Sequence, residues 1–394
     1  MNRRDLLKGL AVAPLALTRA GTLLAAPGAD VKLLLVFLRG GYDCANVLVP
    51  VSSDFYYESR PNIAIARPGA DASAALALDA DWGLHPALRE SLLPLYEARQ
   101  LAFVPFAGTD DLSRSHFETQ DSIELGQPAG ARDFSSGFLN RLATELRGTP
   151  AMSFTDQLPL VFRGEATVPN MALRNLAKPA VDARQAAAIQ SMWRGTRLAA
   201  SVDEGFAVRD EVLRDMAGEM QAASRDAITP RGFELEARRI ARLMRERFSL
   251  GFVDVGGWDT HVGEGGATGF LATRLEELGR ALATFAQEMD GAWQRTVVVV
   301  VSEFGRTFRE NGNRGTDHGH GSVYMVAGGA VRGGRIAGEQ LRVTRENLFQ
   351  DRDYRVLNDY RALLAGLFAR LYGLDAARIA RVFPQATPRD LALA

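Results

Sequence analysis

A short segment after an apolar run gathers side chains that can bind a metal ion or polarise an oxygen. The run at residues 297–301 is five consecutive valines, a pattern typical of a strand buried on both faces. It is followed by Glu303, Arg306, Asp317, His318 and His320. The chain has only five histidines, and two of them occur here beside an aspartate. In open α/β sheets, ligands bind beyond the carboxyl ends of the strands, so this segment predicts a site at that edge.

Three further loops carry similar side chains, and each follows an apolar run. The runs at residues 31–38, 101–106 and 251–255 precede Asp43, then Ser113, Ser115 and His116, then Asp259 and His261. Carboxylates and imidazoles are ligands for zinc, manganese or iron, and carboxylates alone suit magnesium or calcium. If the loops converge, we expect one or two divalent metal ions, about 4 Å apart if there are two. The predicted metal ligands are Asp43, Asp259, His261, Glu303, Asp317, His318 and His320.

Most of these residues also have structural interpretations, which the sequence leaves open. Asp43 could cap the Gly-Gly turn before it, and Asp259 could bond nearby backbone amides in a turn. Glu303 could form a structural ion pair with Arg306, and His116 could be a core or capping histidine. For Cys44, the only cysteine, the role of a small buried side chain is favoured over that of a nucleophile.

The candidate catalytic residues are Ser115, His116, Ser113 and Arg306. Ser113 and Ser115 lie near an expected helix start, where free amides and the helix dipole favour an anion. A serine activated by a metal ion would suit that position. A serine that caps the helix gives the same sequence pattern, so both interpretations remain.

The remaining pattern predicts the elements that must position these side chains. The four apolar runs predict buried parallel strands. Helices are expected at about residues 86–99, 113–125, 230–248, 271–289 and 359–372, with Pro94 able to kink or split the first. Strand, helix and strand in succession over residues 251–301 form a parallel crossover unit. We therefore expect an α/β fold, with helices on both faces of a mostly parallel central sheet.

The N-terminus has the features of an export signal. Arg3 and Arg4 precede a moderately apolar stretch at residues 9–24 and small residues suited to cleavage. Residues 1–28 therefore predict a twin-arginine signal peptide, the twin-arginine translocation machinery as a partner, and a periplasmic or extracellular location. No further segment is long and apolar enough to anchor the mature chain in a membrane. Residues 29–394 are expected to form one domain, with a partly helical insertion at about 150–230.

Composition narrows the possible partners. The chain is 47% apolar and 24% charged, as expected for a globular protein with a substantial core. Its formal net charge of −1 gives no indication of a nucleic-acid or anionic-membrane partner.

Five motifs together resemble the exported proteins of domain-of-unknown-function family 1501 (DUF1501). They are the twin-arginine start and residues 39–43 (RGGYD), 113–118 (SRSHFE), 257–261 (GWDTH) and 302–321 (SEFGR…TDHGHG). The family is similar to the alkaline phosphatase and sulfatase superfamily. That resemblance implies a three-layer α/β/α sandwich and descent from metal-dependent hydrolases.

The resemblance also implies roles for individual residues. Asp43 matches the aspartate after the superfamily's first strand, and the helix beginning near Ser113 to His116 matches the nucleophile helix. Asp259 and His261 match an Asp/His ligand pair. Glu303 and Phe304 stand where the superfamily has Asp and His, and His318 or His320 could compensate. Counting back from Gly126, the nucleophile position falls nearer His116 than either serine.

Three functional hypotheses follow. The first is an exported metal-dependent hydrolase of phosphate or sulfate esters, carried either on a small molecule or on a polymer. In this hypothesis Ser115 or water attacks the ester, and Arg39, Arg114 or Arg306 holds the oxyanion. The alternative is a non-catalytic exported binding or assembly protein that keeps the fold and a structural metal. An oxidoreductase is disfavoured, because the sequence lacks a cysteine cluster, a haem motif and a Gly-rich dinucleotide turn.

Overall fold

The computed structural model of the chain describes residues 31–128, 130–173, 183–208 and 232–394. The predicted signal peptide at residues 1–28 lies outside these residues. Within the described parts of the chain, no helix has the length and apolar character needed to cross a membrane.

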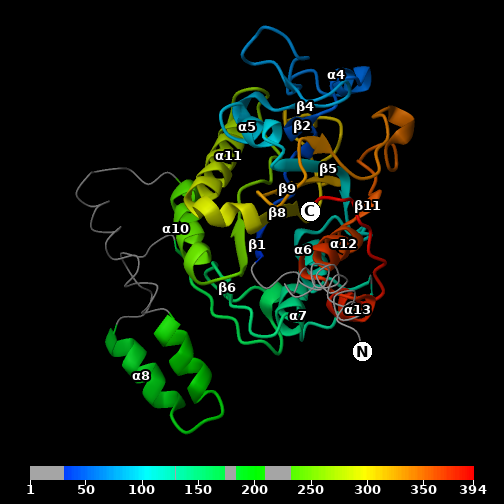
Figure 1. The fold of residues 1–394 in the computed structure, drawn as a ribbon. Coiled ribbons are helices and arrows are strands. Elements are labelled where there is room, and N and C mark those ends of the chain that lie inside the picture. The colour runs from blue at the N-terminus through cyan, green and yellow to red at the C-terminus, as the bar shows by residue number, and fades with distance from the viewer. Residues whose placement is uncertain (1–30, 129, 174–182, 209–231) are drawn as a thin grey trace, which may run out of the picture.

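One large sheet forms the middle of the molecule (Figure 1). Strand β1 (Lys32–Leu38) lies in its interior and pairs in parallel with β8 (Thr296–Ser302) and β7 (Leu250–Val255). β6 (Ala151–Ser153) extends the sheet beyond β7, also in parallel. The mostly parallel sheet predicted from the apolar runs is confirmed.

The other half of the sheet contains a strand that the sequence pattern did not predict. β9 (Ser322–Ala327) runs antiparallel between β8 and β5 (Leu101–Gly108). Since β9 reverses direction relative to both neighbours, β5 is again parallel to β8. Two short strands, β10 (Arg335–Ile336) and β11 (Asn358–Asp359), pair in parallel with β5. A separate small antiparallel sheet contains β2 (Leu48–Val49), β4 (Gly83–Leu84) and β3 (Leu76–Ala77).

Side chains on the central strands alternate between two apolar cores, which explains why these strands appear in sequence as continuous apolar runs. In β1, Leu34 and Val36 belong to one core, and Leu33 and Leu35 belong to the other. The first core is covered by α5 (Leu92–Glu97), α10 (Gly232–Glu246) and α11 (Phe270–Met289). The second is covered by α6 (His116–Leu125), α7 (Phe138–Glu145), α12 (Tyr360–Tyr372) and α13 (Ala376–Val382).

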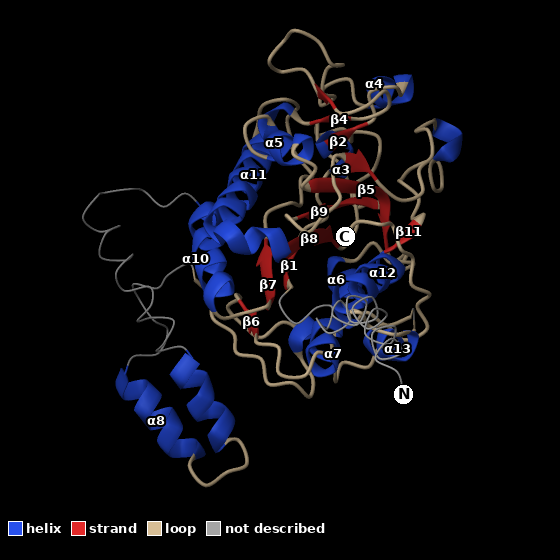
Figure 2. Ribbon diagram, viewed as in Figure 1, coloured by secondary structure: helices blue, strands red, loops and turns tan. Residues whose placement is uncertain are grey.

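The two groups of helices lie on opposite sides of the sheet in Figure 2, which confirms the three-layer α/β/α arrangement. Most predicted helix positions agree with the structure to within a few residues. The helix expected at residues 86–99 is instead the 3-10 turn Pro86–Leu88 followed by α5. The break therefore comes before α5, and Pro94 lies inside its first turn, where proline is tolerated. The remaining short elements are α3 (Cys44–Val47), α4 (Asp54–Ser59) and the 3-10 turns Leu160–Phe162, Asp290–Arg295 and Arg345–Asn347.

Residues 174–182 and 209–230 of the predicted insertion lie outside the described residues, and the described part contains two different structures. Its first residues form β6 and extend the main sheet. Farther on, α8 (Ala183–Trp193) and the helical residues 199–208 form a hairpin that stands apart from the sheet and its covering helices (Figure 1).

Candidate metal centre

Loops from three parts of the sheet bring three histidines to one aspartate. His116 is the first residue of α6, which follows β5. Asp259 and His261 lie in the loop after β7, and His318 lies between β8 and β9. Because β5, β7 and β8 run in the same direction, their carboxyl ends share one edge of the sheet. Three of the four loops considered above therefore meet at this edge, while Asp43 from the fourth lies elsewhere.

All three imidazoles direct Nε2 toward the carboxylate of Asp259. Oδ1 lies 2.9 Å from Nε2 of His261 and 3.3 Å from Nε2 of His318. Oδ2 lies 3.5 Å from Nε2 of His116. The Nε2 atoms of His261 and His318 are 3.1 Å apart. Ligand atoms of His116, Asp259 and His318 all lie within 4.8 Å of one another.

The other nitrogen of each imidazole faces an oxygen acceptor. Nδ1 of His116 lies 2.8 Å from Oε1 of Glu303, and Nδ1 of His261 lies 3.1 Å from Oδ1 of Asp317. Nδ1 of His318 lies 3.0 Å from the backbone oxygen of Arg114. An acceptor at Nδ1 favours the tautomer that carries its proton there and leaves the Nε2 lone pair free. In that tautomer each of the three Nε2 atoms presents a lone pair to the carboxylate of Asp259.

This arrangement requires positive charge between the ligand atoms. A neutral imidazole Nε2 and a carboxylate oxygen both present lone pairs, and at 2.9–3.5 Å they repel each other unless a proton or cation lies between them. Among the residues that the structure describes, Nε2 of His116 is buried without a hydrogen-bond partner. An unpartnered buried nitrogen is unfavourable unless a ligand completes it.

The donor set fits a divalent metal ion. Zinc–nitrogen bonds of 2.0–2.1 Å place tetrahedral ligand atoms about 3.3 Å apart. The ligand-atom distances around Asp259, 2.9–3.5 Å, lie close to that value. Imidazole nitrogens with one carboxylate oxygen suit zinc, iron and manganese better than magnesium or calcium. Of the predicted ligands, Asp259, His261 and His318 lie in this cluster, and His116, proposed above for catalysis, joins them.

Glu303 lies behind His116 rather than inside the cluster. Its side chain is fully buried, and Oε1 accepts hydrogen bonds from Nδ1 of His116, Nε2 of Gln120 and the amide of Gly40. Oε2 accepts a hydrogen bond from Ser302. Burial alone would raise the pKa of Glu303, but these hydrogen bonds outweigh it and hold the pKa below its usual value. Glu303 therefore orients His116, as carboxylates behind metal-binding histidines do.

Arg306 has a similar orienting role at the aspartate. Its buried guanidinium donates to Oδ1 of Asp259 at 2.6 Å and also to Thr316. Partial burial works to raise the pKa of Asp259, but the contact with Arg306 prevails and lowers it. Asp259 is therefore held as an anion. Arg306, predicted to be catalytic, is occupied by this contact and by the carbonyl of Gly40.

Asp43 lies in a separate buried network. Its carboxylate accepts two hydrogen bonds from the buried guanidinium of Arg60, and Glu264 hydrogen-bonds to it as well. Burial opposes ionisation of Asp43, but the charge of Arg60 outweighs it and lowers the pKa. Burial and the adjacent anion raise the pKa of Glu264 well above its usual value. This network joins α3, α4 and the loop after β7, which is a structural role.

The other predicted site residues lie around the cluster. Asp317 is half exposed and orients His261. His320 is buried with its ring against Phe349, and burial lowers the pKa of His320 to about 4. Ser113 and Ser115 form the turn that leads into α6, where Ser113 Oγ accepts from the amide of Ser115.

The arginines proposed to hold an oxyanion are engaged in ion pairs. Arg39 contacts Glu124 at 2.8 Å and Asp254 at 2.7 Å, and Arg114 contacts Asp353 at 2.7 Å. Arg306 is likewise held against Asp259, so all three guanidinium groups already have carboxylate partners.

Sequence reasoning missed three residues of the supporting structure. Gln120 was identifiable, because it lies four residues after His116 and therefore on the same face of α6. It bridges Glu303 to Arg39 through two hydrogen bonds. Arg60 had no such signal, since it is far from every motif in the sequence. Glu264 lies three residues after His261, but its position in the sequence does not indicate its contact with Asp43.

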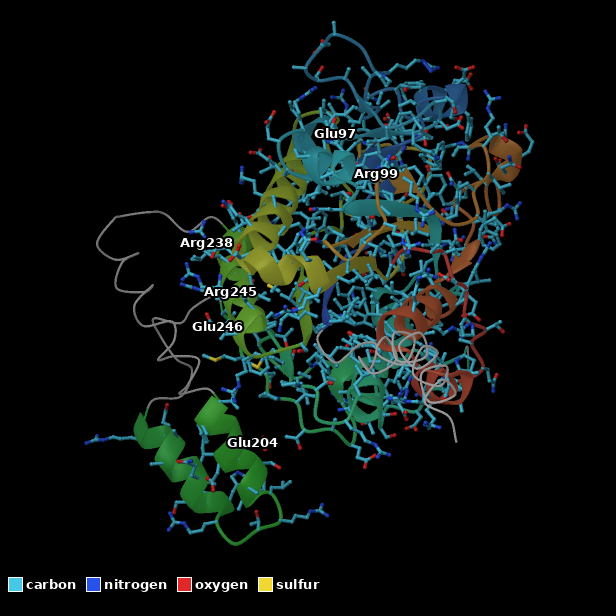
Figure 3. The ribbon with its side chains drawn as sticks, viewed as in Figure 1. Glu97, Arg99, Glu204, Arg238, Arg245 and Glu246 are labelled. Atoms are coloured by element: carbon cyan, nitrogen blue, oxygen red, sulfur yellow. The ribbon has the colours of Figure 1, made fainter. Side chains whose placement is uncertain are left out.

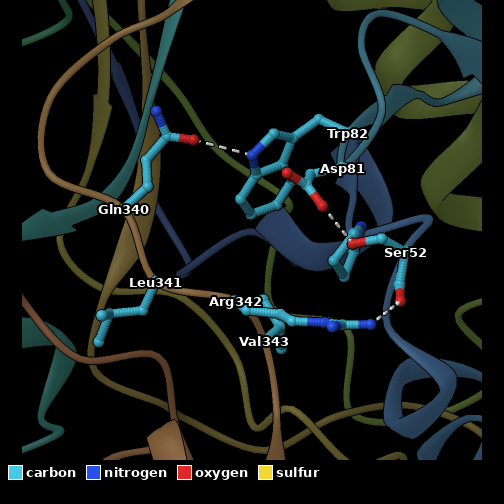
Figure 4. Close-up of a pocket in the computed structure, with 8 residues that line it drawn as sticks. Ser52, Asp81, Trp82, Gln340, Leu341, Arg342 and Val343 are labelled. Atoms are coloured by element: carbon cyan, nitrogen blue, oxygen red, sulfur yellow. Dashed lines mark hydrogen bonds between the residues drawn. The ribbon is translucent and has the colours of Figure 1, made fainter.

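The cluster is open to solvent, with side-chain exposures from 22% at His116 to 43% at Asp259. A separate pocket of about 370 Å³ lies near the small sheet (Figure 4). Its polar groups bond to one another, as Ser52 does to Asp81 and Trp82 does to Gln340. The cluster is therefore better equipped for chemistry than this pocket.

The fold and the cluster define an α/β/α protein with a histidine–aspartate site at the carboxyl edge of its sheet. The chain belongs to the DUF1501 family, described as proteins of unknown function, whose profile matches residues 30–383. No match was found among curated proteins.

Similar solved structures include a protein in the alkaline phosphatase superfamily from Vibrio parahaemolyticus. It is 12% identical with a TM-score of 0.41, over 93% of this chain and 71% of that one. Ps i-CgsB in complex with k-i-k-neocarrahexaose is 8% identical with a TM-score of 0.38, over 92% of this chain and 75% of that one. Ps i-CgsB alone is 10% identical with a TM-score of 0.36 over the same shares of both chains.

Proposed function

We propose that this protein is an exported metal-dependent hydrolase of phosphate or sulfate esters. The observation that supports the proposal best is the arrangement of His116, His261 and His318. Each imidazole has an acceptor at Nδ1 and directs Nε2 at Asp259. Such a preorganised donor set is what a divalent cation requires.

In this proposal Asp259, His261 and His318 hold the metal ion, and His116 either joins them or faces the substrate. A bound divalent cation supplies Lewis-acid polarisation of the ester oxygen. Glu303 keeps His116 in the tautomer with a free Nε2, and Arg306 keeps Asp259 ionised. Ser115, at the start of α6, is the nearest serine along the chain to these groups. The candidate nucleophile is therefore either Ser115 or a water molecule.

The alternative function is a non-catalytic binding or assembly protein with a structural metal. One specific observation favours it. Four side chains surround the site, namely His116, Asp259, His261 and His318. Four protein ligands are typical of structural zinc sites, whereas catalytic zinc sites keep one coordination position open for water or substrate. The paired state of Arg39 and Arg114 agrees with it.

An ester screen separates the two functions. The mature chain, reconstituted in turn with zinc, manganese and iron, is assayed against phosphate and sulfate monoesters and diesters. A hydrolase gives turnover that is lost in His318→Ala and kept in His320→Ala, a histidine outside the cluster. Full metal occupancy without turnover on any ester contradicts the hydrolase and supports the structural metal.

A further inference from the structure

The loop of the helical hairpin is an exposed apolar tip with basic charge. It joins α8 to the helical residues 199–208 and lies at the end of the hairpin farthest from the sheet (Figure 1). Met192 is 78% exposed, Leu198 43% and Trp193 40%. Met192 and Trp193 are the last two residues of α8, and Leu198 ends the loop. All three side chains are therefore exposed at the tip of the hairpin rather than buried between its two helices.

The charges at the tip all have one sign. Arg194 and Arg197 lie between the three apolar side chains, and the stretch from residue 185 to residue 202 contains no acidic residue. The first acids are Asp203 and Glu204 on the second helix, and Figure 3 shows Glu204 away from the loop. The surface of α10, by contrast, carries mixed charges, with Glu246 beside Arg245 and Arg238 farther along the same helix in this view.

The hairpin holds the tip in a fixed shape. Thr196 Oγ1 donates to the carbonyl of Trp193 at 2.8 Å and accepts from the amide of Leu198 at 3.3 Å. Gln190 on α8 donates to Asp203 on the second helix at 3.2 Å. Because the loop is already ordered by its own hydrogen bonds, binding would require little further ordering of its backbone.

We propose that this tip docks on the surface of an anionic phospholipid bilayer. Tryptophan is favoured at the membrane interface, where its apolar ring and polar N–H lie at headgroup depth. Met192 and Leu198 would enter the acyl boundary, while Arg194 and Arg197 contact lipid phosphates. A nucleic acid would match the arginines but would leave Met192 and Leu198 exposed, so the apolar side chains favour lipid.

Vesicle binding tests this directly. The full mature chain is sedimented with vesicles of phosphatidylcholine alone and of phosphatidylcholine with about 30% phosphatidylglycerol, where anionic lipid attracts basic residues near the surface. We expect binding to the anionic vesicles only, weakened by salt. Arg194→Gln/Arg197→Gln should lower the partition coefficient about 30-fold, as roughly 1 kcal/mol per arginine implies. Trp193→Ala/Leu198→Ala should also weaken binding and should remove quenching of tryptophan fluorescence by brominated lipid.

The matched control is Arg147→Gln/Arg184→Gln, which makes the same change in net charge at exposed residues outside the tip. The inference is overturned if this control weakens binding as much as the tip variant does, or if no vesicle is bound. It is also overturned if light scattering shows that the wild type associates with itself through Trp193 and Leu198, because the tip would then be an interface between copies. Circular dichroism confirms that each variant is folded.

Discussion

At the scale of single residues, the chemistry of the site depends on which nitrogen of each histidine is occupied. Glu303, Asp317 and the carbonyl of Arg114 accept at Nδ1 of three different imidazoles. Each acceptor favours the tautomer with its proton at Nδ1, and in that tautomer the three Nε2 lone pairs are available to one cation. The strongest of these acceptors is Glu303, because it is fully buried and ionised.

Replacing Glu303 by glutamine tests this orienting role. A glutamine side chain can still accept a hydrogen bond from His116 and can donate one to Ser302. The substitution removes only the negative charge behind the imidazole. We expect about 10- to 100-fold weaker zinc binding, measured by competition with a chelator. Asp317→Asn should have a smaller effect, since its carboxylate is half exposed to water. Asp351→Asn, at an exposed ion pair outside the cluster, is the control. Unchanged affinity in Glu303→Gln would contradict the role.

A second prediction concerns Glu264. Its pKa is raised in the folded state by burial and by Asp43, so the folded protein retains a proton that the unfolded chain releases above about pH 4.3. The free energy of unfolding should therefore fall as pH rises above that value, by up to about 1.4 kcal/mol per pH unit. Glu264→Gln keeps the hydrogen bonds of a protonated carboxyl and should flatten this dependence. Urea unfolding at several pH values between 5 and 8 measures the free energy of unfolding of the wild type and of Glu264→Gln. If this free energy changes equally with pH in both proteins, the prediction is contradicted.

At the scale of elements, α6 must be fixed at both ends because it carries His116 at its first position. Its C-terminal end stops at Gly126, whose φ of +62° favours glycine. A methyl group added there would come within 2.7 Å of Phe138 Cβ and 3.1 Å of Phe383. The end of α6 is thus packed against α7 and the residue that follows α13.

Gly126→Ala should therefore destabilise the protein through both backbone strain and overpacking. We expect a loss of about 2–4 kcal/mol in the free energy of unfolding. Gly148→Ala is a matched control, because Gly148 also has positive φ, at +80°, but has no atom within 4 Å of an added methyl group. It should lose only about 1 kcal/mol through strain. If urea unfolding shows that Gly126→Ala and Gly148→Ala lose the same free energy of unfolding, packing around Gly126 contributes nothing to stability.

The elements also show how far the sequence could predict the structure. β1 and β8 were predictable because both of their faces are buried, which produces unbroken apolar runs. β9 is as apolar, but its antiparallel direction depends on how the loop of residues 303–321 returns to the sheet, and side-chain pattern carries no such information. His261 and His318 were predictable from their places after strands. The partners of Asp43 and His116 were not, because Arg60 and Glu303 meet them only through tertiary packing.

At the scale of the whole molecule, the sheet supplies a rigid edge and the cluster is built from loops on that edge. Side chains beneath it alternate between two buried cores, so the strand ends have little freedom to move. The hairpin, in contrast, projects away from this body (Figure 1). We therefore expect metal binding and lipid binding to be separable by mutation.

Export is a property of the whole chain that its N-terminal sequence predicts. Arg3→Lys/Arg4→Lys should leave the protein in the cytoplasm with its signal uncleaved, since the twin arginines are the recognised feature. Arg19→Lys makes a similar change within the same segment and should be exported normally. Fractionation of cells followed by mass measurement of the chain distinguishes the outcomes. Normal export of the double variant would contradict the predicted pathway.

The measurement that tests the central claim most directly is the metal content of the mature chain, compared among single histidine variants. The wild type and each of His116→Ala, His261→Ala, His318→Ala and His320→Ala are purified, reconstituted and analysed for bound zinc, manganese and iron. We predict at least one equivalent of metal in the wild type and in His320→Ala, and a marked loss in His261→Ala and His318→Ala. Absence of metal from the reconstituted wild type, or equal metal in all five proteins, would contradict a metal centre at Asp259.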